Sequence, residues 1–428
     1  MKPSTSRRSF LASSIGGAAA FQIIRPELVR GQGNPKMRAG LIGCGGRGTQ
    51  AMENILTGTD NVEIVAMADI FEDRLEGSIR TTQALKPELS KRFKVDAEHR
   101  FVGFDAYKKL VASDVDIVML AANPAYRPMH FEAAVEAKKH VFCEKPMGTD
   151  ATGIRRFLAA AQKSRDLKLT VKSGAQRRSQ AWYLDEYKRV KDGGIGDIVH
   201  MNAYWVGTPV LNFMNSKMFP NNKRDPKWGD LEWQQRNWYS FLWICGDQIV
   251  EQHLHNIDVC NWFMGTHPVE VVASGGAAWR PREEEYGNIY DHLAADFVYP
   301  NGVHMSSRCR QYRGPGIAQN VSERLVGTKG VIDSIALRGA KLPFDPYVQE
   351  HMDMRDSILG KGPYINEAME VAESTMTCIM GREAAYSGLK ITWDMIMNSQ
   401  QDLMPKNFDY KASFPVPPLP VPGEYKFV

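Results

Sequence analysis

A glycine-rich turn near the start of the chain is the feature that most restricts its fold. The run Gly43-Cys44-Gly45-Gly46-Arg47-Gly48 fits the pattern G-x-G-x-x-G. It follows an apolar segment, 37–42, that predicts a strand, and the next segment, 47–56, has the composition of a helix. In this setting the first glycine permits a tight turn and the second lets phosphate groups approach the backbone, while the third lets the helix pack closely on the strand. The turn therefore predicts the first unit of a dinucleotide-binding sheet.

Strand and helix patterns continue to alternate after this turn. Short apolar runs that predict strands are separated by longer segments of helical composition. The expected strands are 62–69, 115–121 and 140–143, and the expected helices are 71–85, 130–137 and 153–164. Alternation of this kind is typical of a parallel sheet covered by helices on both faces.

Asp69 ends the second of these strands, 26 residues after Gly43. An acidic residue at this point accepts hydrogen bonds from the ribose hydroxyls of a dinucleotide. Its negative charge repels a 2′-phosphate, so we expect NAD as the cofactor. NADP stays an alternative, because Arg47 and Arg74 lie nearby in the sequence.

Lys145 follows the strand at 140–143, inside the sequence Glu144-Lys145-Pro146. Ligands bind at the carboxyl ends of the strands in such sheets, so this lysine is expected beside the cofactor. Oxidation of an alcohol needs a hydride acceptor and a group that takes the hydroxyl proton, and a lysine serves when its pKa is lowered. Glu144 is expected to orient the lysine, and Pro146 to allow a cis peptide. A surface lysine at a strand end is the alternative.

A second group of polar residues lies in the predicted helix 249–263. Glu251, His255 and Asp258 are spaced i, i+4 and i+7, so a regular helix places them on one face. A carboxylate one turn from a histidine tunes the charge and position of its ring. A buried structural network is one alternative, and a metal site is another. We expect no metal, because His253 points to another face of the helix and the H-E-x-x-H pattern is absent. The structural network stays an alternative to catalysis.

The pattern of the chain changes after residue 165. Strand-like segments joined by turns replace the strict alternation, at 198–205, 270–274, 292–299 and 302–309. We therefore expect an α/β protein with an N-terminal Rossmann doubly wound parallel sheet and a C-terminal α/β domain whose sheet is open and largely antiparallel. The expected domains are an export signal and linker at 1–33, the Rossmann domain at 34–165, the substrate domain at 166–405 and a proline-rich tail at 406–428.

Taken together, these motifs resemble those of the Gfo/Idh/MocA family of oxidoreductases. The resemblance rests on the glycine turn, on Glu144-Lys145-Pro146 and on a later motif of the form G-G-x-x-x-D-x-G-x-H-x-x-D. In this chain Glu251 takes the first Asp position of the later motif, His255 the His position and Asp258 the last Asp position. His253 replaces the usual glycine. The resemblance covers most of the chain after residue 33 and implies that Lys145 acts in catalysis beside the nicotinamide, together with His255 and Glu251.

The resemblance also implies roles in cofactor and substrate binding. Asn123 and His130 match a segment that lies along the nicotinamide ribose, and Glu144 and Lys145 border the same group. Gln176 and Arg177 follow a strand at 169–173 that we expect to open the second domain, which would place both near the substrate. Asp258 is predicted to contact the substrate as well.

Aromatic residues are concentrated between residues 182 and 262. Flat aromatic faces stack on the C–H groups of sugars, while their polar edges form hydrogen bonds. We expect Trp205, within the first strand of the second sheet, to contact a sugar-like substrate. Core packing or a subunit interface is the alternative for any one of these tryptophans.

Composition excludes several other classes of protein. Lys and Arg number 53 and Asp and Glu 49, and the sequence contains no long basic run, so we expect no nucleic-acid partner. The six cysteines are scattered without a C-x-x-C pair, so a zinc ribbon or a dense disulfide framework is not expected. No apolar stretch approaches the ~20 residues of a membrane-spanning helix. The open face of the second sheet favours a homodimer or homotetramer.

The N-terminus predicts export. Ser6-Arg7-Arg8-Ser9-Phe10-Leu11 precedes a weakly apolar stretch, 12–24, and this order is typical of a bacterial twin-arginine (Tat) signal. A disordered N-terminal arm is the alternative. The Tat pathway carries folded proteins, so a periplasmic or exported location suits an enzyme that carries its cofactor with it.

These observations predict an NAD(P)-dependent oxidoreductase that transfers a hydride between a nicotinamide cofactor and a ring hydroxyl of a sugar or glycoside. A glycosidase of the same fold is an alternative; such enzymes oxidise the sugar transiently and eliminate the aglycone. A non-catalytic protein that binds a sugar or a cofactor is a third class. The presence of both Lys145 and His255 argues against this third class.

Overall fold

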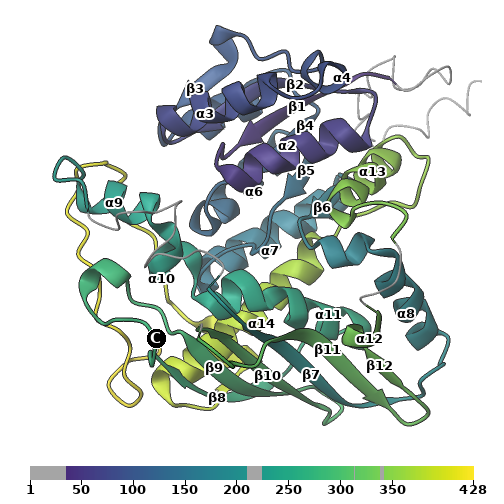
Figure 1. Ribbon diagram of the computed structural model, residues 1–428, viewed down its shortest axis with the longest axis vertical. Coiled ribbons are helices and arrows are strands. Elements are labelled where there is room, and N and C mark those ends of the chain that lie inside the picture. Colours follow the sequence, from purple (N-terminus) through teal and green to yellow (C-terminus); the bar gives the residue numbers. More distant parts are fainter. Residues whose placement is uncertain (1–34, 210–223, 313, 338–341) are drawn as a thin grey trace, which may run out of the picture. The chain divides into compact units, whose positions relative to one another are not determined.

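The computed structural model describes residues 35–209, 224–312, 314–337 and 342–428. The predicted export signal at 1–33 lies outside the described residues. All helices and strands named below belong to one unit, Lys36–Val428. It contains two sheets with helices between and around them (Figure 1).

The first sheet has six parallel strands in the order β3-β2-β1-β4-β5-β6. Its strands are β1 (Met37–Ile42), β2 (Val62–Asp69), β3 (Arg100–Val102), β4 (Ile117–Leu120), β5 (His140–Cys143) and β6 (Val171–Ser173). The chain winds outward in one direction from β1 to β3 and in the other from β4 to β6. The carboxyl ends of β1 and β4 thus flank the switch point where a doubly wound sheet binds its ligand. The predicted Rossmann fold is confirmed.

Helices cover both faces of this sheet, and one of them comes from the far end of the sequence. On one face, α2 (Gly46–Gly58), α3 (Glu72–Gln83) and α13 (Pro346–Ile358) pack their apolar side chains on the strands. On the other face lie α5 (Ala106–Ala112), α6 (Arg127–Glu136) and α7 (Ala151–Asp166). Short helix α4 (Pro87–Ser90) lies at the side of the strands. Because both faces are buried, the strands are continuously apolar rather than alternating.

The strand at 169–173 does not open the second domain as predicted. Residues 171–173 form β6, the last strand of the first sheet, and Phe142 of β5 pairs with Lys172 in parallel register. The Lys172 ammonium is buried and forms an ion pair with Glu367, with 2.7 Å between Nζ and Oε1. This long-range partner explains how a lysine fits a buried strand, and the sequence around it does not reveal that partner.

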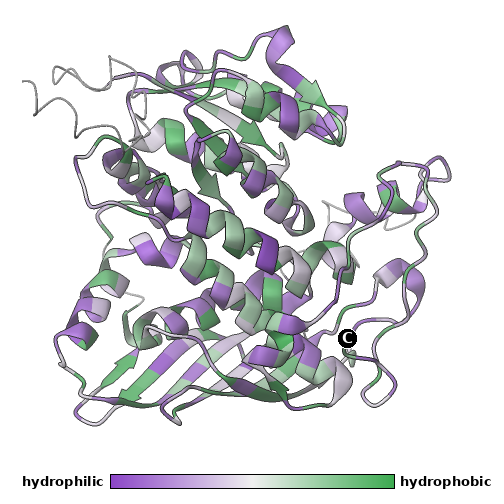
Figure 2. Ribbon diagram, turned by 180° about the vertical axis from the view of Figure 1, so that it is seen from behind, coloured by the Kyte–Doolittle hydropathy of each residue, from purple (hydrophilic) through white to green (hydrophobic). Residues whose placement is uncertain are grey.

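The second sheet has seven strands in the order β12-β11-β7-β10-β9-β8-β13. Its strands are β7 (Ile198–Gly207), β8 (Glu270–Gly276), β9 (His292–Val298), β10 (His304–Gln311), β11 (Asn320–Gly327), β12 (Val331–Asp333) and β13 (Ile391–Thr392). Only the β7–β10 pair is parallel among these described strands, so the predicted, largely antiparallel sheet is confirmed. Buried positions alternate with more exposed ones along β9 and β10, and hydrophobic and hydrophilic residues are interspersed along the strands of this sheet (Figure 2).

The remaining helices lie beside or between the sheets. They are α8 (Ala181–Lys191), α9 (Asp230–Arg236), α10 (Leu242–Cys245), α11 (Leu254–Met264), α12 (Ser334–Leu337), α14 (Ala368–Ser387) and α15 (Trp393–Asn398). A π-helical turn, η5 (Ile249–His253), leads directly into α11, so the predicted helix 249–263 is not regular throughout. The 3-10 turns are η1 (Ala97–His99), η2 (Pro124–Tyr126), η3 (Gln176–Ser179), η4 (Trp238–Ser240) and η6 (Glu284–Tyr286).

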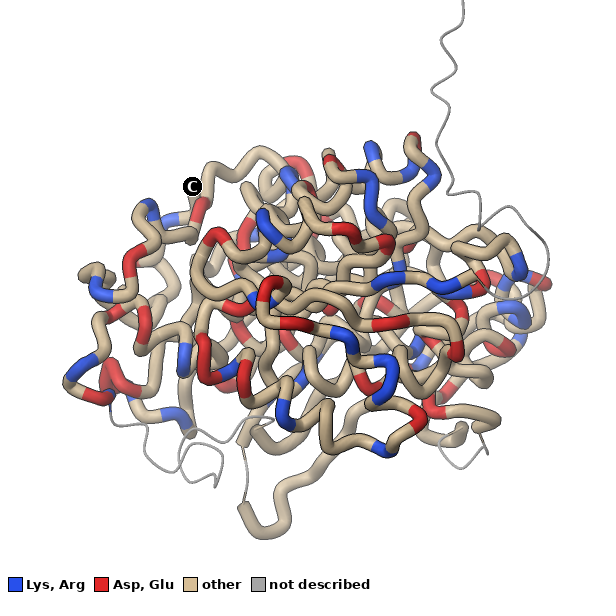
Figure 3. Tube along the Cα trace, turned by 90° about the horizontal axis from the view of Figure 1, so that it is seen from above, with Lys and Arg blue, Asp and Glu red and all other residues tan. Residues whose placement is uncertain are grey.

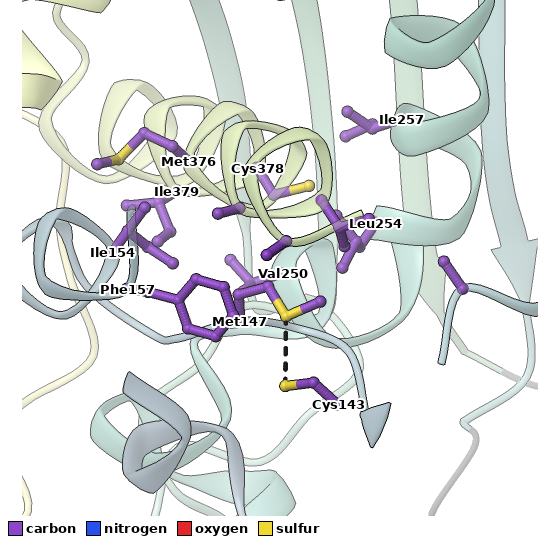
Figure 4. Packing of buried hydrophobic residues seen from close by; sticks show 14 of the residues in the cluster. Cys143, Met147, Ile154, Phe157, Val250, Leu254, Ile257, Met376, Cys378 and Ile379 are labelled. Atoms are coloured by element: carbon purple, nitrogen blue, oxygen red, sulfur yellow. Dashed lines mark hydrogen bonds between the residues drawn. The ribbon is translucent and has the colours of Figure 1, made fainter. Parts of the chain in front are cut away.

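A continuous apolar core joins the two sheets. Phe157 of α7, Leu254 of α11 and Ile379 of α14 meet there, and Met147, which follows the Glu144-Lys145-Pro146 segment, lies among them (Figure 4). The Sδ atom of Met147 lies 3.6 Å from the Sγ of Cys143. Core packing therefore holds the loop that carries Lys145 in place, and this limits the conformations that the lysine can adopt.

The described residues carry mixed charges, free cysteines and a tail that packs on the rest of the chain. Acidic and basic residues are interspersed along the described trace (Figure 3). All six cysteines are buried and unpaired. No described helix is long and apolar enough to cross a membrane. The proline-rich tail lies against its own chain, where the Tyr410 hydroxyl donates to the carbonyl of Ile70.

Candidate active site

The glycine turn is shaped by close backbone contacts. Gly43 has a φ of +98°, and a Cβ there would lie 2.2 Å from the backbone nitrogen of Ala122. A Cβ on Gly48 would lie 1.9 Å from the carbonyl oxygen of Gly43. Both distances are far below van der Waals contact, so packing within the protein requires these two glycines.

Gly45 and Gly46 are different, because a Cβ on either would meet no protein atom within 4 Å. Both line a cavity at the carboxyl end of β1. The first turn of α2 has no acidic residue and no side-chain cap, so its amides face the cavity unblocked. Open space over glycines at the N-terminus of a helix fits the pyrophosphate of a dinucleotide.

The cavity has a volume of about 370 Å³. Asp69, Asn123 and His130 line it together with three glycines of the turn and Arg47, so the structure brings most of the predicted cofactor residues to one place. His130 is buried between Tyr107 and Tyr126, with ring centroids 4.4 and 5.8 Å away. Burial lowers its pKa to about 3, and the charge of Arg127 lowers it further. The ring is therefore neutral and packs as part of the cavity lining.

Asp69 holds the glycine turn in place. Its Oδ2 accepts a hydrogen bond from the amide of Cys44 at 2.6 Å, and its Oδ1 accepts one from the amide of Phe71 at 2.8 Å. Burial raises its pKa to about 6, although the two amide hydrogen bonds lower it in part. The carboxylate faces the cavity with acceptor capacity to spare, as recognition of ribose hydroxyls requires.

The affinity for NAD is expected to fall as the pH drops below about 6. The ribose hydroxyls donate to the charged carboxylate of Asp69, so binding favours the deprotonated form that exists above its pKa. Titrating the dissociation constant of NADH from pH 8 to pH 5 by fluorescence measures this effect. An Asp69→Asn variant should bind more weakly and lose the pH dependence. An unchanged dependence in that variant would assign it to another group.

Lys145 follows β5 and is not among the residues that line this cavity. Its Nζ donates to the backbone carbonyl of Glu251 and lies 3.1 Å from the Oε1 of the same residue. Burial raises the pKa of Glu251, and the positive charges of Lys145 and Arg127 oppose that rise. The peptide bond between Lys145 and Pro146 is cis, the isomer that the sequence analysis allowed for Pro146. Lysine and glutamate thus form a buried pair 106 residues apart in the sequence.

His255 follows Glu251 by four residues, in the first turn of α11. Its pKa is lowered well below the ordinary value by burial, with further contributions from the charges of Lys145 and Arg177. The imidazole is therefore neutral and has a lone pair to accept a proton. Its ring stacks on Trp205 at a centroid distance of 5.8 Å and an angle of 26°. No residue of the described chain hydrogen-bonds to its ring nitrogens, which leaves them available to a substrate.

Glu144 is fixed by the glycine turn. Arg47 donates through Nε to the Oε1 of Glu144, and its Nη2 lies 3.3 Å from the Oε1 of Glu350 on α13. A Cβ on Gly174 would lie 2.4 Å from the Oε2 of Glu144, so the carboxylate packs tightly against that backbone. Arg47 thus connects the pyrophosphate turn to the residue before Lys145, a role that the sequence pattern did not predict.

The predicted substrate residues have different positions. Arg177 forms an ion pair with Glu323 and lies close enough to lower the pKa of His255, so it borders the site. Gln176 donates to the Tyr347 hydroxyl at 3.1 Å, and its own Oε1 is buried without a partner in the described residues. Trp205 borders the site through His255.

Asp258 faces away from the Lys145 pair. Both its oxygens accept from Arg178, at 2.8 Å each, and the two side chains are buried. The π turn at 249–253 changes the helical phase between Glu251 and α11, whereas His255 and Asp258 both lie within α11. Asp258 is set apart by its buried partner Arg178, which the helical spacing does not reveal. His253 points elsewhere, as predicted, and its Nε2 lies 2.7 Å from the Ser307 hydroxyl.

Several site residues were missed by sequence reasoning. They are Arg127, Glu323, Tyr347 and Glu350. Arg127 donates to the carbonyl of Pro146, so it supports the Lys145 loop. The helix that carries Tyr347 and Glu350 begins with Asp345 as N-cap and Pro346 in the first turn, and this start signal was available in the sequence. The described residues contain no group of three His, Cys, Asp or Glu side chains that fits a metal ion.

The fold and the glycine turn define a dinucleotide-binding protein, and comparison with known proteins identifies the nucleotide. Residues 37–173 match the model of the oxidoreductase family with an NAD-binding Rossmann fold, GFO_IDH_MocA. The first domain is therefore an NAD-binding Rossmann domain. The match ends at the last residue of β6, in agreement with the extent of the first sheet.

Two curated proteins are similar over more than the first domain. The uncharacterized oxidoreductase YrbE of Bacillus subtilis is 26% identical over 294 residues, which cover 68% of this chain and 71% of that protein. The myo-inositol 2-dehydrogenase of Thermotoga maritima is 25% identical over 255 residues, which cover 60% of this chain and 62% of the enzyme.

A solved structure supports the whole two-sheet architecture. The scyllo-inositol dehydrogenase of Lactobacillus casei, with bound NAD(H) and scyllo-inositol, has a TM-score of 0.62 at 20% identity. The superposition covers 83% of this chain and 99% of that enzyme. At this identity the likeness establishes the fold.

Proposed function

We propose that the chain is an NAD-dependent oxidoreductase of the Gfo/Idh/MocA family that oxidises a ring hydroxyl of a sugar, a glycoside or a related cyclic polyol. One observation carries the proposal: Lys145, which follows strand β5 of the NAD-binding sheet, forms a buried pair with Glu251, four residues before His255 on the neighbouring helical segment. The inositol dehydrogenases among the similar proteins act on a cyclic polyol, which supports a ring hydroxyl as the reacting group.

The chemistry divides between the cofactor and three side chains. Bound NAD supplies the hydride acceptor. Lys145 is placed to donate a hydrogen bond to the reacting hydroxyl, which stabilises negative charge on its oxygen as the proton leaves. His255 is placed to take that proton, because its ring is neutral and its nitrogens are unoccupied by protein groups. Glu251 holds the ammonium group in position.

The substrate side of the proposal rests on the surroundings of His255. Trp205 presents an aromatic face beside the imidazole, and the charge of Arg177, which is paired with Glu323, also acts on that ring. An apolar face next to polar donors suits the alternating C–H and hydroxyl surface of a sugar ring. We further propose that the N-terminal twin-arginine sequence directs export and that the protein acts as a homodimer or homotetramer.

The proposal is tested with purified protein and a panel of aldoses, inositols and glycosides. Net formation of NADH with one or a few of these compounds is expected. Release of an aglycone without net NADH would replace the dehydrogenase by a glycosidase that oxidises its substrate transiently. Binding of sugars without either product, in protein loaded with NAD, would show a non-catalytic binding protein.

A further inference from the structure

Two segments from outside the Rossmann domain close over its nucleotide cavity. The first is 228–240, which contains α9 and η4, and the second is the tail segment 404–414; together they are called the cover below. Gln235, Arg236 and Trp238 of the cover line the cavity alongside residues of the first sheet. The tail, yellow in Figure 1, runs beside α9.

The two segments of the cover are joined to each other. A Cβ on Gly229 would lie 2.3 Å from the carbonyl oxygen of Tyr410, so the tail backbone presses on the start of α9. Asp230 accepts from the amide of Phe414 at 2.8 Å, and Gln234 donates to the carbonyl of the same residue. The tail therefore packs with α9 as one body.

Arg236 attaches α9 to the first domain. Its guanidinium carbon lies 3.9 Å from the centroid of the Phe71 ring, and its Nη atoms lie 3.2–3.3 Å from the carboxylate of Asp73. Asp73 is exposed, so the ion pair by itself contributes little. The stacked guanidinium is the stronger contact, because it covers the aromatic face of a residue that lines the cavity.

Tyr410 attaches the tail to the first domain. Its hydroxyl donates to the carbonyl of Ile70, and its ring lies 4.6 Å from the ring of Phe104 and 5.8 Å from that of Phe71. Phe104 and Phe71 both line the cavity, whereas Tyr410 does not. Phe408, beside it in the tail, packs on Phe104 as well, at 5.4 Å.

We propose that the cover retains bound NAD, so that the cofactor leaves the protein slowly and acts as a resident group. The covered end is the end near Asp69, where the adenosine half of the dinucleotide binds under the proposed function. For NAD to leave through this side, α9 and the tail must separate from Phe71 and Phe104. The contacts of Arg236 and Tyr410 oppose that separation, so they slow release while leaving the chemistry at Lys145 unchanged.

The test measures release of the cofactor from the full chain. Protein loaded with NADH is mixed with excess NAD, and the loss of bound NADH fluorescence gives the release rate. Wild-type protein is expected to keep its nucleotide through desalting. Tyr410→Ala, which changes no residue of the cavity lining, is expected to release NADH about tenfold faster, and Arg236→Ala at least as fast. Tyr410→Phe keeps the ring contacts and should fall between wild type and Tyr410→Ala.

A tyrosine elsewhere provides the matched control. The Tyr364 hydroxyl donates to the carbonyl of Leu169 at 3.1 Å, away from the cavity, so Tyr364→Ala should release NADH at the wild-type rate. Equal release from Tyr410→Ala and wild type, or release from Tyr364→Ala as fast as from Tyr410→Ala, would overturn the role of the cover. Failure of every variant and of wild type to bind NADH would instead overturn the proposed function, so the two failures are distinguishable.

Discussion

Replacing Lys145 with methionine is expected to lower kcat about a thousandfold while the affinity for NADH changes little. Positioned acid–base groups contribute about 10²–10⁴ in rate, and a thousandfold loss corresponds to about 4 kcal/mol of transition-state stabilisation. Methionine preserves the length of the side chain but removes the ammonium group that Glu251 holds. The rate is measured with saturating substrate, and NADH binding is measured separately by fluorescence.

Two further variants decide whether the effect is catalytic. Lys139→Met is the matched control, because Lys139 donates to a backbone carbonyl at 2.8 Å in the same domain and should keep the wild-type kcat. Glu251→Gln retains volume and a hydrogen-bond acceptor but loses the charge that holds the ammonium group, so the pH profile of kcat should shift. Full turnover in Lys145→Met would remove the lysine from the mechanism.

The parts of the fold that could be predicted from the sequence are those that depend on residues close together in the chain. The strands at 37–42, 62–69 and 140–143 match the structure residue for residue, because each is a short apolar run ended by glycine or a charge. The glycine turn was equally readable. Its third glycine is required by a contact within the turn, and its first by residues that follow the neighbouring strand β4, as expected for folds of this kind.

The parts that could not be predicted depend on partners far away in the sequence. Lys172 fits a buried strand only because Glu367 is folded onto it, and Arg47 reaches Glu350 from 303 residues away. The helix at 346–358 covers the first sheet although it follows the strands of the second. Pattern reasoning assigns residues to elements, but it does not say which distant element packs against them.

The candidate site shows the same division. Lys145 and Glu251, which belong to two separate motifs of the sequence, form the expected pair, and His255 follows Glu251 by four residues. Helical spacing, however, extended the group to Asp258. The structure gives Asp258 a buried partner instead, Arg178, which lies 80 residues away in the sequence and which helical spacing does not reveal.

Asp258 is expected to determine stability rather than substrate binding, so Asp258→Ala should destabilise the protein by about 3–5 kcal/mol. The substitution leaves the Arg178 guanidinium buried without its bidentate partner, and an unpaired buried charge is among the most costly changes a core can receive. Arg178 also lies over the ring of Trp262 at 5.3 Å, and its side chain is buried, so water poorly replaces the lost carboxylate. Thermal unfolding measures the effect as a lower Tm.

Matched variants separate stability from substrate contact. Glu370→Ala breaks the more exposed pair with Arg165 and should cost less than about 1 kcal/mol. The double variant Arg178→Met/Asp258→Leu removes both charges and should recover most of the loss, since apolar replacement of a buried pair is often neutral or stabilising. Below its unfolding temperature, Asp258→Ala should keep the wild-type KM for the sugar. A raised KM with an unchanged Tm would instead place Asp258 in the substrate site.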